Sequence, residues 1–371
     1  MRKRDKSRKA NRAYYIESNR PLGGVFFRED TGKRDRVMVS ICTTFKNADK
    51  YIKNLIESVL EQTHRNVELV LVDECSTDNS EQVIKSYKDD RIKYFKLEED
   101  TGIAQCLRSA FEVTKGEYVV FPGADDWLAP DFIERGLRDF ERYPDCAGIV
   151  PKIVTMESLG NDKFQYHSVI DIPSRVYSKD WFVKKIYRST IGVASIMALV
   201  RRKDALKFIN YFIDNYVESP LSPEPLKGMY RRLFGTDMFF FLYILELYSH
   251  LVWDKSLVLY KTIQPDSIKF SELRQDSFGD ILKYYHYHIL TYSKVYQDFY
   301  PSSQNRMKAW IATEAIATAI LYYLKNKFNP MFFRFSGSEE FLTNLSPIEK
   351  LKVALLSGPR ILHRVCSYLV R

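Results

Sequence analysis

The sequence lacks the usual patterns that give cysteines a bonding or metal-binding role. Its five cysteines (Cys42, Cys75, Cys106, Cys146 and Cys366) form an odd, scattered set with no C-x-x-C pair. No cysteine–histidine spacing of the zinc-site kind occurs either. Because the neighbouring residues are apolar or helical in pattern, we expect reduced, buried thiols, which are typical of an intracellular, cytoplasmic protein.

Long apolar runs are also missing. A membrane-spanning helix needs about 18 or more predominantly apolar residues, and the nearest approach, 309–324, is interrupted by Glu314 and by threonines. The basic start of the chain is followed by no apolar stretch, so it does not look like a secretory signal. We therefore expect a protein that is soluble or attached to a membrane only at its surface.

The middle of the chain lacks an excess of positive charge, although the net charge of the whole chain is +9. Residues 1–36 carry a net +7 and residues 346–371 a net +4, which leaves −2 for residues 37–345. A protein that coats nucleic acid usually has its positive field on the folded body. We therefore expect no nucleic-acid partner, and we interpret residues 1–36 as a basic N-terminal arm.

From residue 37 onward the pattern alternates between strands and helices. Apolar runs of strand length lie at 37–42, 67–72, 92–95 and 118–121, and helical patterns lie at 50–62, 79–87 and 103–114. This alternation predicts an α/β fold with a parallel sheet that is covered by helices on both faces. In such sheets ligands bind beyond the carboxyl ends of the strands, which directs attention to the junctions 43–47, 73–78 and 122–127.

The rhythm becomes irregular after a helix at 129–143. Further strands are predicted at 148–155, 195–200, 251–253 and 257–262, and a further helix at 237–247. From about residue 272 the chain is aromatic and poor in strand patterns. An all-helical C-terminal region over 271–371 is the simplest interpretation.

The three junctions carry polar side chains suited to a nucleotide. Thr43, Thr44 and Phe45 at the first strand end could hold a flat base by hydrogen bonding and stacking. Asp73 ends the second strand, where a carboxylate can accept hydrogen bonds from a base or ribose. The residues that follow Asp73, 76–78, are also explained as the N-cap of a helix, but Asp73 itself is not.

The third junction delivers two adjacent carboxylates, Asp125 and Asp126, into a loop. Hard oxygen ligands of this kind suit Mg²⁺ or Mn²⁺, which can in turn bridge a diphosphate. Adjacent aspartates also occur in surface turns and at helix N-termini, and Pro130 precedes the next helix. Both a metal site and a turn are therefore open interpretations of this pair.

Taken together, the junctions resemble the nucleotide-sugar-binding half of the family-2 glycosyltransferases. The matching segments, in order and spacing, are 39–41, 47–52, 58–63, 70–80, 102–104, 115–118 and 125–128. The resemblance implies the A-type glycosyltransferase fold, a Rossmann-like mixed sheet with helices on both faces, followed by a helical C-terminal subdomain. It implies a catalytic domain over 37–270, with a donor half at 37–145 and an acceptor half at 146–270.

The resemblance also implies donor-binding roles. Asp73 would contact the base or ribose, and residues 43–45 would line the base pocket together with Asn47. Asp125 would bind the divalent cation, Mn²⁺ or Mg²⁺, as the last acid of the family's D-x-D motif. The two preceding positions of that motif are Gly123, where the family has an acid, and Ala124.

Several further positions depart from the family pattern. Cys75 stands where the family usually has glycine. Arg108 stands where the family often has asparagine, and we also place it in the donor pocket. The loss of the first motif acid at Gly123 implies weaker metal dependence or even lost activity. A catalytically degenerate, donor-binding or scaffolding relative is therefore the alternative to an enzyme.

A second match supplies the catalytic base. Residues 234–238 resemble the family's helix-starting E-D segment, in which Asp237 would be the base and Thr236 replaces the glutamate. Without the resemblance, we would favour the simpler interpretation of Asp237 as an acid that stabilises a helix N-terminus. The acceptor-binding or site-closing residues would be Asp126, Trp127, Gln264 and Ser267, and the family often has histidine where Gln264 stands.

The implied activity is inverting, non-processive transfer of a sugar from a nucleotide diphosphate sugar, most simply a UDP-sugar, to a hydroxyl of a glycan or lipid-linked acceptor. Processive synthases of the family carry membrane spans and a Q-x-x-R-W segment, and this sequence has neither. By analogy the setting is assembly of a surface polysaccharide.

The C-terminal segment 346–371 has a distinct pattern. After Pro359, an apolar stripe is flanked by Arg360, His363 and Arg364, which is the profile of an interfacial helix on anionic lipid. A helix packed on the body of the protein fits the same pattern. The first interpretation predicts a peripheral protein on the inner face of the cell membrane.

Overall fold

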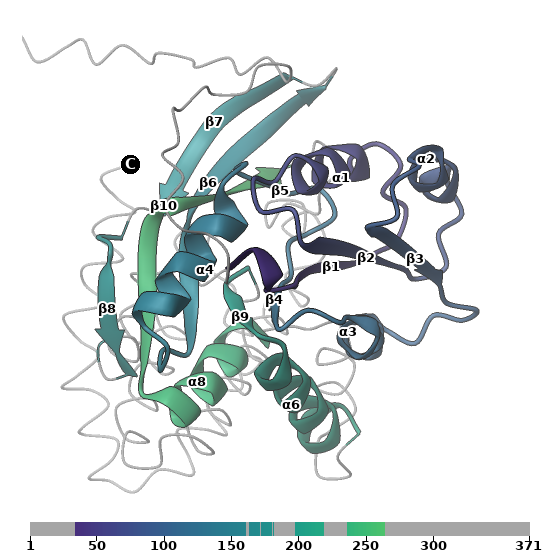
Figure 1. Cartoon of the computed structure of the whole chain (residues 1–371). Coiled ribbons are helices and arrows are strands. Elements are labelled where there is room, and N and C mark those ends of the chain that lie inside the picture. The colour runs from purple at the N-terminus through teal and green to yellow at the C-terminus, as the bar shows by residue number, and fades with distance from the viewer. Residues whose placement is uncertain are drawn as a thin grey trace, which may run out of the picture.

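In the computed structural model, the described residues are 34–160, 163–170, 172–179, 181, 197–218 and 236–263. Their strands form one ten-stranded mixed sheet in the order β3-β2-β1-β4-β9-β6-β10-β5, with β7 added beside β6 and β8 beside β10 (Figure 1). The strands are β1 (Val39–Phe45), β2 (Val67–Asp73), β3 (Ile92–Lys96), β4 (Tyr118–Val120), β5 (Trp127–Leu128), β6 (Gly148–Gly160), β7 (Lys163–Ile170), β8 (Arg175–Ser178), β9 (Leu199–Arg201) and β10 (His250–Ile263).

The helices cover both faces of this sheet, as the sequence predicts. They are α1 (Ile52–Leu60), α2 (Ser80–Ser86), α3 (Ile103–Val113), α4 (Phe132–Arg142), α6 (Arg202–Phe212) and α8 (Thr236–Tyr248), with a 3₁₀ turn at Arg34–Arg36 and a π-helical turn at Ile213–Val217. One apolar core lies between the sheet and α1 and α4. The other lies between the opposite face and α3, α6 and α8. None of the helices in the described ranges has the length and apolarity to cross a bilayer.

The central parallel strands follow from their sequences. β2 reads Val-Glu-Leu-Val-Leu-Val-Asp and is buried throughout, and β1 is buried except for half-buried Thr44. Near-continuous apolar runs of this kind are typical of parallel strands covered on both faces. β1 pairs in parallel with both β2 and β4, so the carboxyl ends of all three strands meet at one edge of the sheet.

A buried carboxylate fixes the register at the opposite ends of these strands. Glu68 accepts hydrogen bonds from the Ser40 hydroxyl and from the Lys115 amide, both at 2.5 Å. The Gly116 amide in turn donates to the Ser40 hydroxyl at 2.8 Å. A Cβ on Gly116 would lie 2.5 Å from the Ser40 amide nitrogen, so glycine is required for this close approach.

The sheet is less parallel than periodicity alone predicts. β9 runs antiparallel to β4 and β6, and β5 and β8 run antiparallel to β10. The two strands expected at 251–253 and 257–262 are one strand, β10, with a bulge between Asp254 and Val258. Short or irregular strands carry too little pattern for their direction to be predicted, whereas the mixed sheet implied by the family resemblance is observed.

The helix start expected at 76–78 is also shifted. The N-cap position of α2 is Asn79, and its side chain makes no capping hydrogen bond. Instead Asp78 accepts hydrogen bonds from the amide and hydroxyl of Ser80, at 3.0 and 2.6 Å. Asp78 therefore stabilises the start of α2 from the position before the N-cap residue Asn79.

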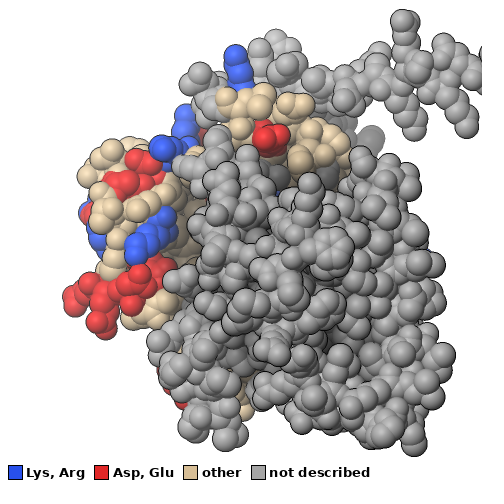
Figure 2. Space-filling view, turned by 180° about the vertical axis from the view of Figure 1, so that it is seen from behind, with Lys and Arg blue, Asp and Glu red and all other residues tan. Residues whose placement is uncertain are grey.

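The surface that the described residues form behind the view of Figure 1 carries acidic and basic side chains side by side (Figure 2). This mixture fits the small net charge of residues 37–345. The arm at 1–33, the C-terminal region 271–371 and the segment 346–371 lie outside the described residues, so their predicted roles stay predictions from the sequence.

Candidate functional site

The site begins where β1 and β2 end side by side. Phe45 is paired with Asp73 in the parallel ladder, and the Glu74 amide donates to the Phe45 carbonyl at 2.8 Å. β4 pairs with β1 through Val120 and Ile41, so the loop that follows β4 leaves the sheet at the same edge. The three junctions singled out in the sequence are therefore brought together by the sheet.

Asp73 is fully buried and both of its carboxylate oxygens already have partners. Oδ1 accepts a hydrogen bond from the Ser76 amide at 2.7 Å, and Oδ2 accepts one from the Tyr94 hydroxyl at 2.8 Å. Burial and the Asp73 carboxylate raise the pKa of Tyr94, which keeps this hydroxyl a donor. In this arrangement Asp73 ties the loop after β2 to β3.

Glu74, the next residue, differs from Asp73 in one decisive respect. Only 6% of the residue is exposed, yet its Oε1 atom has no hydrogen-bond partner among the residues that the structure describes. Burial, and then the charge of Asp100 and a hydrogen bond to it, raise the pKa of the Glu74 carboxyl. Buried polar atoms are rarely left unpaired without a reason, and this distinguishes Glu74 from Asp73, whose two oxygens both have partners. The sequence interpretation missed it, although it stands next to Asp73.

A charged cluster surrounds Glu74. Lys46, just beyond β1, donates to Asp100 Oδ2 at 2.9 Å, and the Gly102 amide donates to Asp100 Oδ1 at 3.2 Å. The hydrogen bond from Lys46 is the largest of the effects that lower the pKa of Asp100. The cluster holds the loop before α3 against the ends of β1 and β2.

The residues of the first junction are mostly turned into the protein. Thr43 and Phe45 are buried, and Thr44 is half-buried. Asn47 is exposed and has a left-handed backbone (φ 56°), and its Oδ1 accepts a hydrogen bond from the Thr77 amide at 2.9 Å. Asn47 therefore joins the first junction to the second, and the predicted base-lining roles of residues 43–45 stay predictions.

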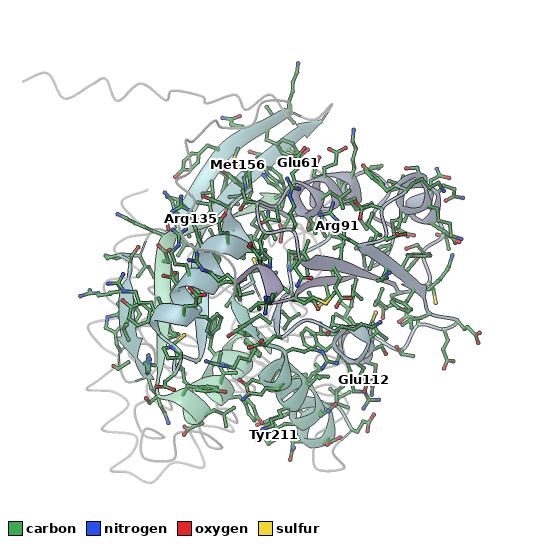
Figure 3. The ribbon with its side chains drawn as sticks, viewed as in Figure 1. Glu61, Arg91, Glu112, Arg135, Met156 and Tyr211 are labelled. Atoms are coloured by element: carbon green, nitrogen blue, oxygen red, sulfur yellow. The ribbon has the colours of Figure 1, made fainter. Side chains whose placement is uncertain are left out.

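Two departures from the family pattern also lie near this edge. Cys75 has a left-handed backbone (φ 59°) and its thiol donates to the Leu97 carbonyl at 3.3 Å. Arg108 lies on α3 with its Nε 3.9 Å from Glu112 Oε1, which Figure 3 labels on the same helix. Its side chain is 35% exposed, so it is not committed to the core.

The loop after β4 is tied to β10. Asp126 is 1% exposed, and its carboxylate accepts hydrogen bonds from the Gly123 amide at 2.9 Å and from the Thr262 amide at 3.1 Å. The Thr262 hydroxyl also donates to the Asp125 carbonyl. Burial, and then the charge of Asp125, raise the pKa of Asp126 to about 7. These two effects are larger than the lowering of the pKa by the two amide hydrogen bonds.

A side chain at Gly123 would crowd the two carboxylates of this loop. A Cβ at that position would lie 2.9 Å from Asp125 Oδ1 and 2.9 Å from Asp126 Oδ2, closer than a carbon can approach. The half-buried Asp125 and the buried Asp126 therefore both place a carboxylate oxygen where the first acid of a D-x-D motif would begin. Gly123, where the family has an acid, therefore lies in a loop whose Asp126 carboxylate accepts hydrogen bonds from backbone amides.

Trp127 and Ala124 lie on the two sides of this loop. Ala124 packs against the core beneath α1 and α4. Trp127 begins β5, stacks on Tyr260 of β10 with ring centroids 5.2 Å apart, and contacts Phe164 of β7 at 4.8 Å. These contacts join the donor edge to the acceptor half.

The remaining predicted residues are placed only in part. Asp237 lies in the first turn of α8, which is where a helix-starting acid is expected. Gln264 and Ser267 lie outside the described residues. Within the described ranges, no group of three or more His, Cys, Asp or Glu side chains is arranged to hold a metal ion.

Comparison with known proteins shows what this arrangement is similar to. Residues 40–205 match the model of glycosyl transferase family 2. The chain is similar to TuaG of Bacillus subtilis, a putative teichuronic acid biosynthesis glycosyltransferase, with 38% identity over 112 residues, which are 30% of this chain and 44% of the relative. It is also similar to WfaP of Escherichia coli, with 34% identity over 90 residues, which are 24% of this chain and 36% of the relative. The matches thus span less than half the length of these relatives.

Among solved structures, the chain is similar to S. aureus TarS, with a TM-score of 0.55 and 16% sequence identity, covering 89% of this chain and 53% of that one. At this identity the likeness concerns the fold alone. The mixed sheet and this likeness confirm the fold expected from the sequence.

Proposed function

We propose that the chain is a glycosyltransferase of family 2, the family whose model matches residues 40–205, and that it transfers a sugar from a nucleotide diphosphate sugar to a hydroxyl group of a glycan or lipid-linked acceptor. The observation that carries the proposal is the unpaired, buried Oε1 atom of Glu74 at the edge where the three strand ends meet. A uracil ring presents one N–H group between two carbonyls, and a buried carboxyl with an unpaired oxygen is a matching acceptor.

In this proposal Glu74 takes the base contact expected of Asp73. Both oxygens of Asp73 are already bonded to Ser76 and Tyr94, so Asp73 shapes the pocket from beneath. A UDP donor is supported by the relative WfaP, which is named as using UDP-Glc with a diphosphoundecaprenol-linked acceptor. A role in surface polysaccharide assembly is supported by TuaG, which is named for teichuronic acid biosynthesis.

The chemistry is a single displacement. Asp237 removes the proton of the acceptor hydroxyl, the acceptor oxygen bonds to the anomeric carbon, and the bond from that carbon to the diphosphate breaks. One displacement inverts the anomeric configuration. A positioned general base contributes about 10²- to 10⁴-fold to such a step.

A divalent cation, Mn²⁺ or Mg²⁺, would be held by Asp125 and mainly by the phosphates of the donor. Mg²⁺ is commonly bound through one or two carboxylates together with substrate phosphates, and the half-buried Asp125 suits such a site. The buried Asp126 is instead engaged by two amides. When bound, the cation would stabilise the charge that develops on the leaving diphosphate.

The test is hydrolysis or transfer of UDP-glucose, UDP-galactose and UDP-N-acetylglucosamine with Mn²⁺ present. We expect Asp237→Asn to lower kcat by about 10²- to 10⁴-fold while UDP still binds, and Asp125→Asn to weaken the response to Mn²⁺. Asp90→Asn, an exposed acid between α2 and β3, is the matched control.

Two outcomes would contradict the enzymatic proposal. If the wild type and both site variants bind UDP but hydrolyse the UDP-sugars at equal background rates, the chain is a degenerate donor-binding relative. That alternative is motivated by Gly123, Thr236 and Gln264. If UDP does not bind to the wild type at all, the proposal that this edge of the sheet binds the donor nucleotide is contradicted.

A further inference from the structure

The loop between β3 and α3 returns to the strand-end edge of the sheet. This loop, residues 97–102, projects beyond the end of β3 (Figure 1). At its start the Leu97 amide donates to the Asp73 carbonyl at 2.9 Å, which ties the loop to the end of β2. Asp100 of the loop is hydrogen bonded to the side chain of Glu74. The loop therefore places a second carboxyl group beside the acid that we assign to the base.

Asp100 is held in its ionised form by two donors. The Lys46 ammonium group donates to Oδ2 at 2.9 Å, and the Gly102 amide donates to Oδ1 at 3.2 Å. The pKa of Asp100 is lowered, first by the hydrogen bond from Lys46 and then by the hydrogen bond with Glu74. Asp100 thus presents a carboxylate, a group that only accepts hydrogen bonds, to its neighbour.

The hydrogen bond between Glu74 and Asp100 contains one proton, because two ionised carboxylates cannot donate to each other. Since Lys46 and Gly102 stabilise the anion of Asp100, this proton lies on Glu74. Burial, then the charge of Asp100 and the hydrogen bond to it, raise the pKa of the Glu74 carboxyl. The charge of Lys46 and the Gly102 amide oppose this shift with smaller effects. The proton on Glu74 is therefore controlled from the loop.

The other titratable groups around Glu74 do not replace this pairing. Both oxygens of Asp73 are bonded elsewhere, and the Cys75 thiol donates to a backbone carbonyl. Burial, followed by the charges of the neighbouring acids, raises the pKa of Cys106 on α3 to about 12, so its thiol stays neutral. Among the described residues, the cation that acts on Glu74 is Lys46.

The protonation state of a carboxyl group decides which pyrimidine it can bind. Uracil presents a ring N–H group, which needs an ionised carboxylate as its acceptor. Cytosine presents a bare ring nitrogen at the same place, which needs the O–H group of a protonated carboxyl as its donor. Oε1 of Glu74 has no partner among the described residues. A residue that controls the proton on Glu74 therefore controls the choice between the two bases.

We propose that Asp100 is a specificity-determining residue that sets, through its hydrogen bond to Glu74, the balance between uridine and cytidine nucleotides at this edge of the sheet. The inference rests on the proposed function, in which Glu74 contacts the base. A uridine nucleotide binds ionised Glu74, so the shared proton leaves to solvent on binding. A cytidine nucleotide binds protonated Glu74 and releases no proton. The preference for uridine therefore grows as the pH rises and shrinks as the pH falls.

The experiment is calorimetric titration of UDP and of CDP into the full chain between about pH 5 and about pH 8. Both nucleotides carry the same diphosphate, so the titration of the phosphates cancels in the ratio of the two affinities. When UDP binding releases one proton more than CDP binding does, the ratio of UDP affinity to CDP affinity rises about tenfold per pH unit. We expect that slope for the wild type and no slope for Glu74→Gln, which cannot ionise.

Two variants of opposite sign test the role of the loop. Asp100→Asn removes the negative charge beside Glu74, so the ratio is expected to move about three- to tenfold toward UDP, a modest shift because Asp100 is exposed. Lys46→Gln removes the opposing positive charge and is expected to move the ratio toward CDP. Glu99→Gln removes an exposed acid of the same loop and is the matched control, expected to behave as the wild type.

The inference is overturned if UDP binds but the ratio does not change with pH, or if CDP stays undetectable at the lowest pH. It is also overturned if Asp100→Asn changes the ratio no more than Glu99→Gln does. A shift of Asp100→Asn and Lys46→Gln in the same direction would show that the loop acts through its shape, which contradicts the proposal as well. Absence of UDP binding at every pH would instead contradict the proposed function, and the inference would fall with it.

Discussion

At the scale of single residues, the candidate site is built from positions that are unusual for their residue type. Glu74 is a buried acid with an oxygen that has no partner among the described residues, Cys75 is a non-glycine residue with a left-handed backbone, and Gly123 lies where an added Cβ would crowd two carboxylates. Strained or unsatisfied positions tend to gather at functional sites. Their clustering around the ends of β1, β2 and β4 is what separates this edge from the rest of the sheet.

The backbone of Cys75 gives a prediction for stability. A non-glycine residue in the left-handed region costs about 1–2 kcal/mol. Cys75→Gly removes that cost but adds freedom to the unfolded chain and loses the thiol bond to Leu97, so we expect a net gain of about 0.5–1 kcal/mol in the free energy of unfolding. Urea denaturation measures it. Cys75→Ala keeps the Cβ and should show no gain, and equal stability of the two variants would refute the strain.

The crowding at Gly123 gives a second prediction. Gly123→Ala places a Cβ against the carboxylates of Asp125 and Asp126, and overpacking of this kind costs about 1–3 kcal/mol. Thermal unfolding of the variant should show that loss. In an Asp125→Ala background the loss should shrink, because one of the two contacts has been removed. If Gly123→Ala is as stable as the wild type, the loop has room for the missing motif acid and the crowding is refuted.

At the scale of elements, the sequence predicts the first half of the sheet well and the second half poorly. β1 and β2 are recognisable because strands buried on both faces are almost wholly apolar. β7 was not predicted, although its first five residues, Lys-Phe-Gln-Tyr-His, alternate between polar and apolar side chains as a strand does. The helix at Arg202–Phe212 was also not predicted, although its buried residues Ala205, Phe208, Ile209 and Phe212 recur at helical spacing.

The site shows the same division. The sequence locates the three strand ends, because acids and hydroxyls there interrupt apolar runs. It does not tell Asp73 from Glu74, since that choice depends on Ser76 and Tyr94 bonding to Asp73 from outside the strand. The sequence also does not predict that Asp126 is bonded to the backbone, because the Thr262 amide that donates to its carboxylate comes from a strand 136 residues away in the chain.

The bulge of β10 meets α4 at a pair of carboxyl groups, and this contact predicts how stability depends on pH. Burial, and then the charge of Asp254, raise the pKa of Asp139 to about 7, while Arg142 and Arg138 oppose the shift. One buried oxygen of Asp139, Oδ2, has no hydrogen-bond partner within the described ranges of the chain. The folded state therefore binds a proton at Asp139 that the unfolded chain releases near pH 4, about the ordinary pKa of an aspartate.

A group whose pKa is raised on folding gives stability that is lost as the pH rises toward the folded-state pKa. We therefore expect the contribution of Asp139 to the wild-type melting temperature to fall between about pH 4 and about pH 7. Asp139→Asn, which cannot ionise, should be favoured over the wild type more strongly at pH 8 than at pH 5. A difference in melting temperature that does not change with pH would exclude this pair as the cause.

At the scale of the whole molecule, one sheet unites the predicted donor and acceptor halves. β4 of the first half and β6 of the second are joined through β9, and β10 returns to pair with β5 beside the candidate metal loop. The core on one face reaches from α3 to α8. The likeness to TarS extends over 89% of this chain, so the arrangement is that of a known fold.

The central claim is that the strand-end edge binds the base of a uridine nucleotide through Glu74. The most direct measurement is calorimetric titration of UDP and CDP into the wild type, Glu74→Ala and the surface control Glu81→Ala. We expect the wild type and Glu81→Ala to prefer UDP, because cytosine lacks the ring N–H, and Glu74→Ala to lose about 10- to 150-fold in UDP affinity, as expected for a hydrogen bond to a charged group. UDP affinity that is equal in Glu74→Ala and Glu81→Ala, or absent from the wild type, would contradict the account.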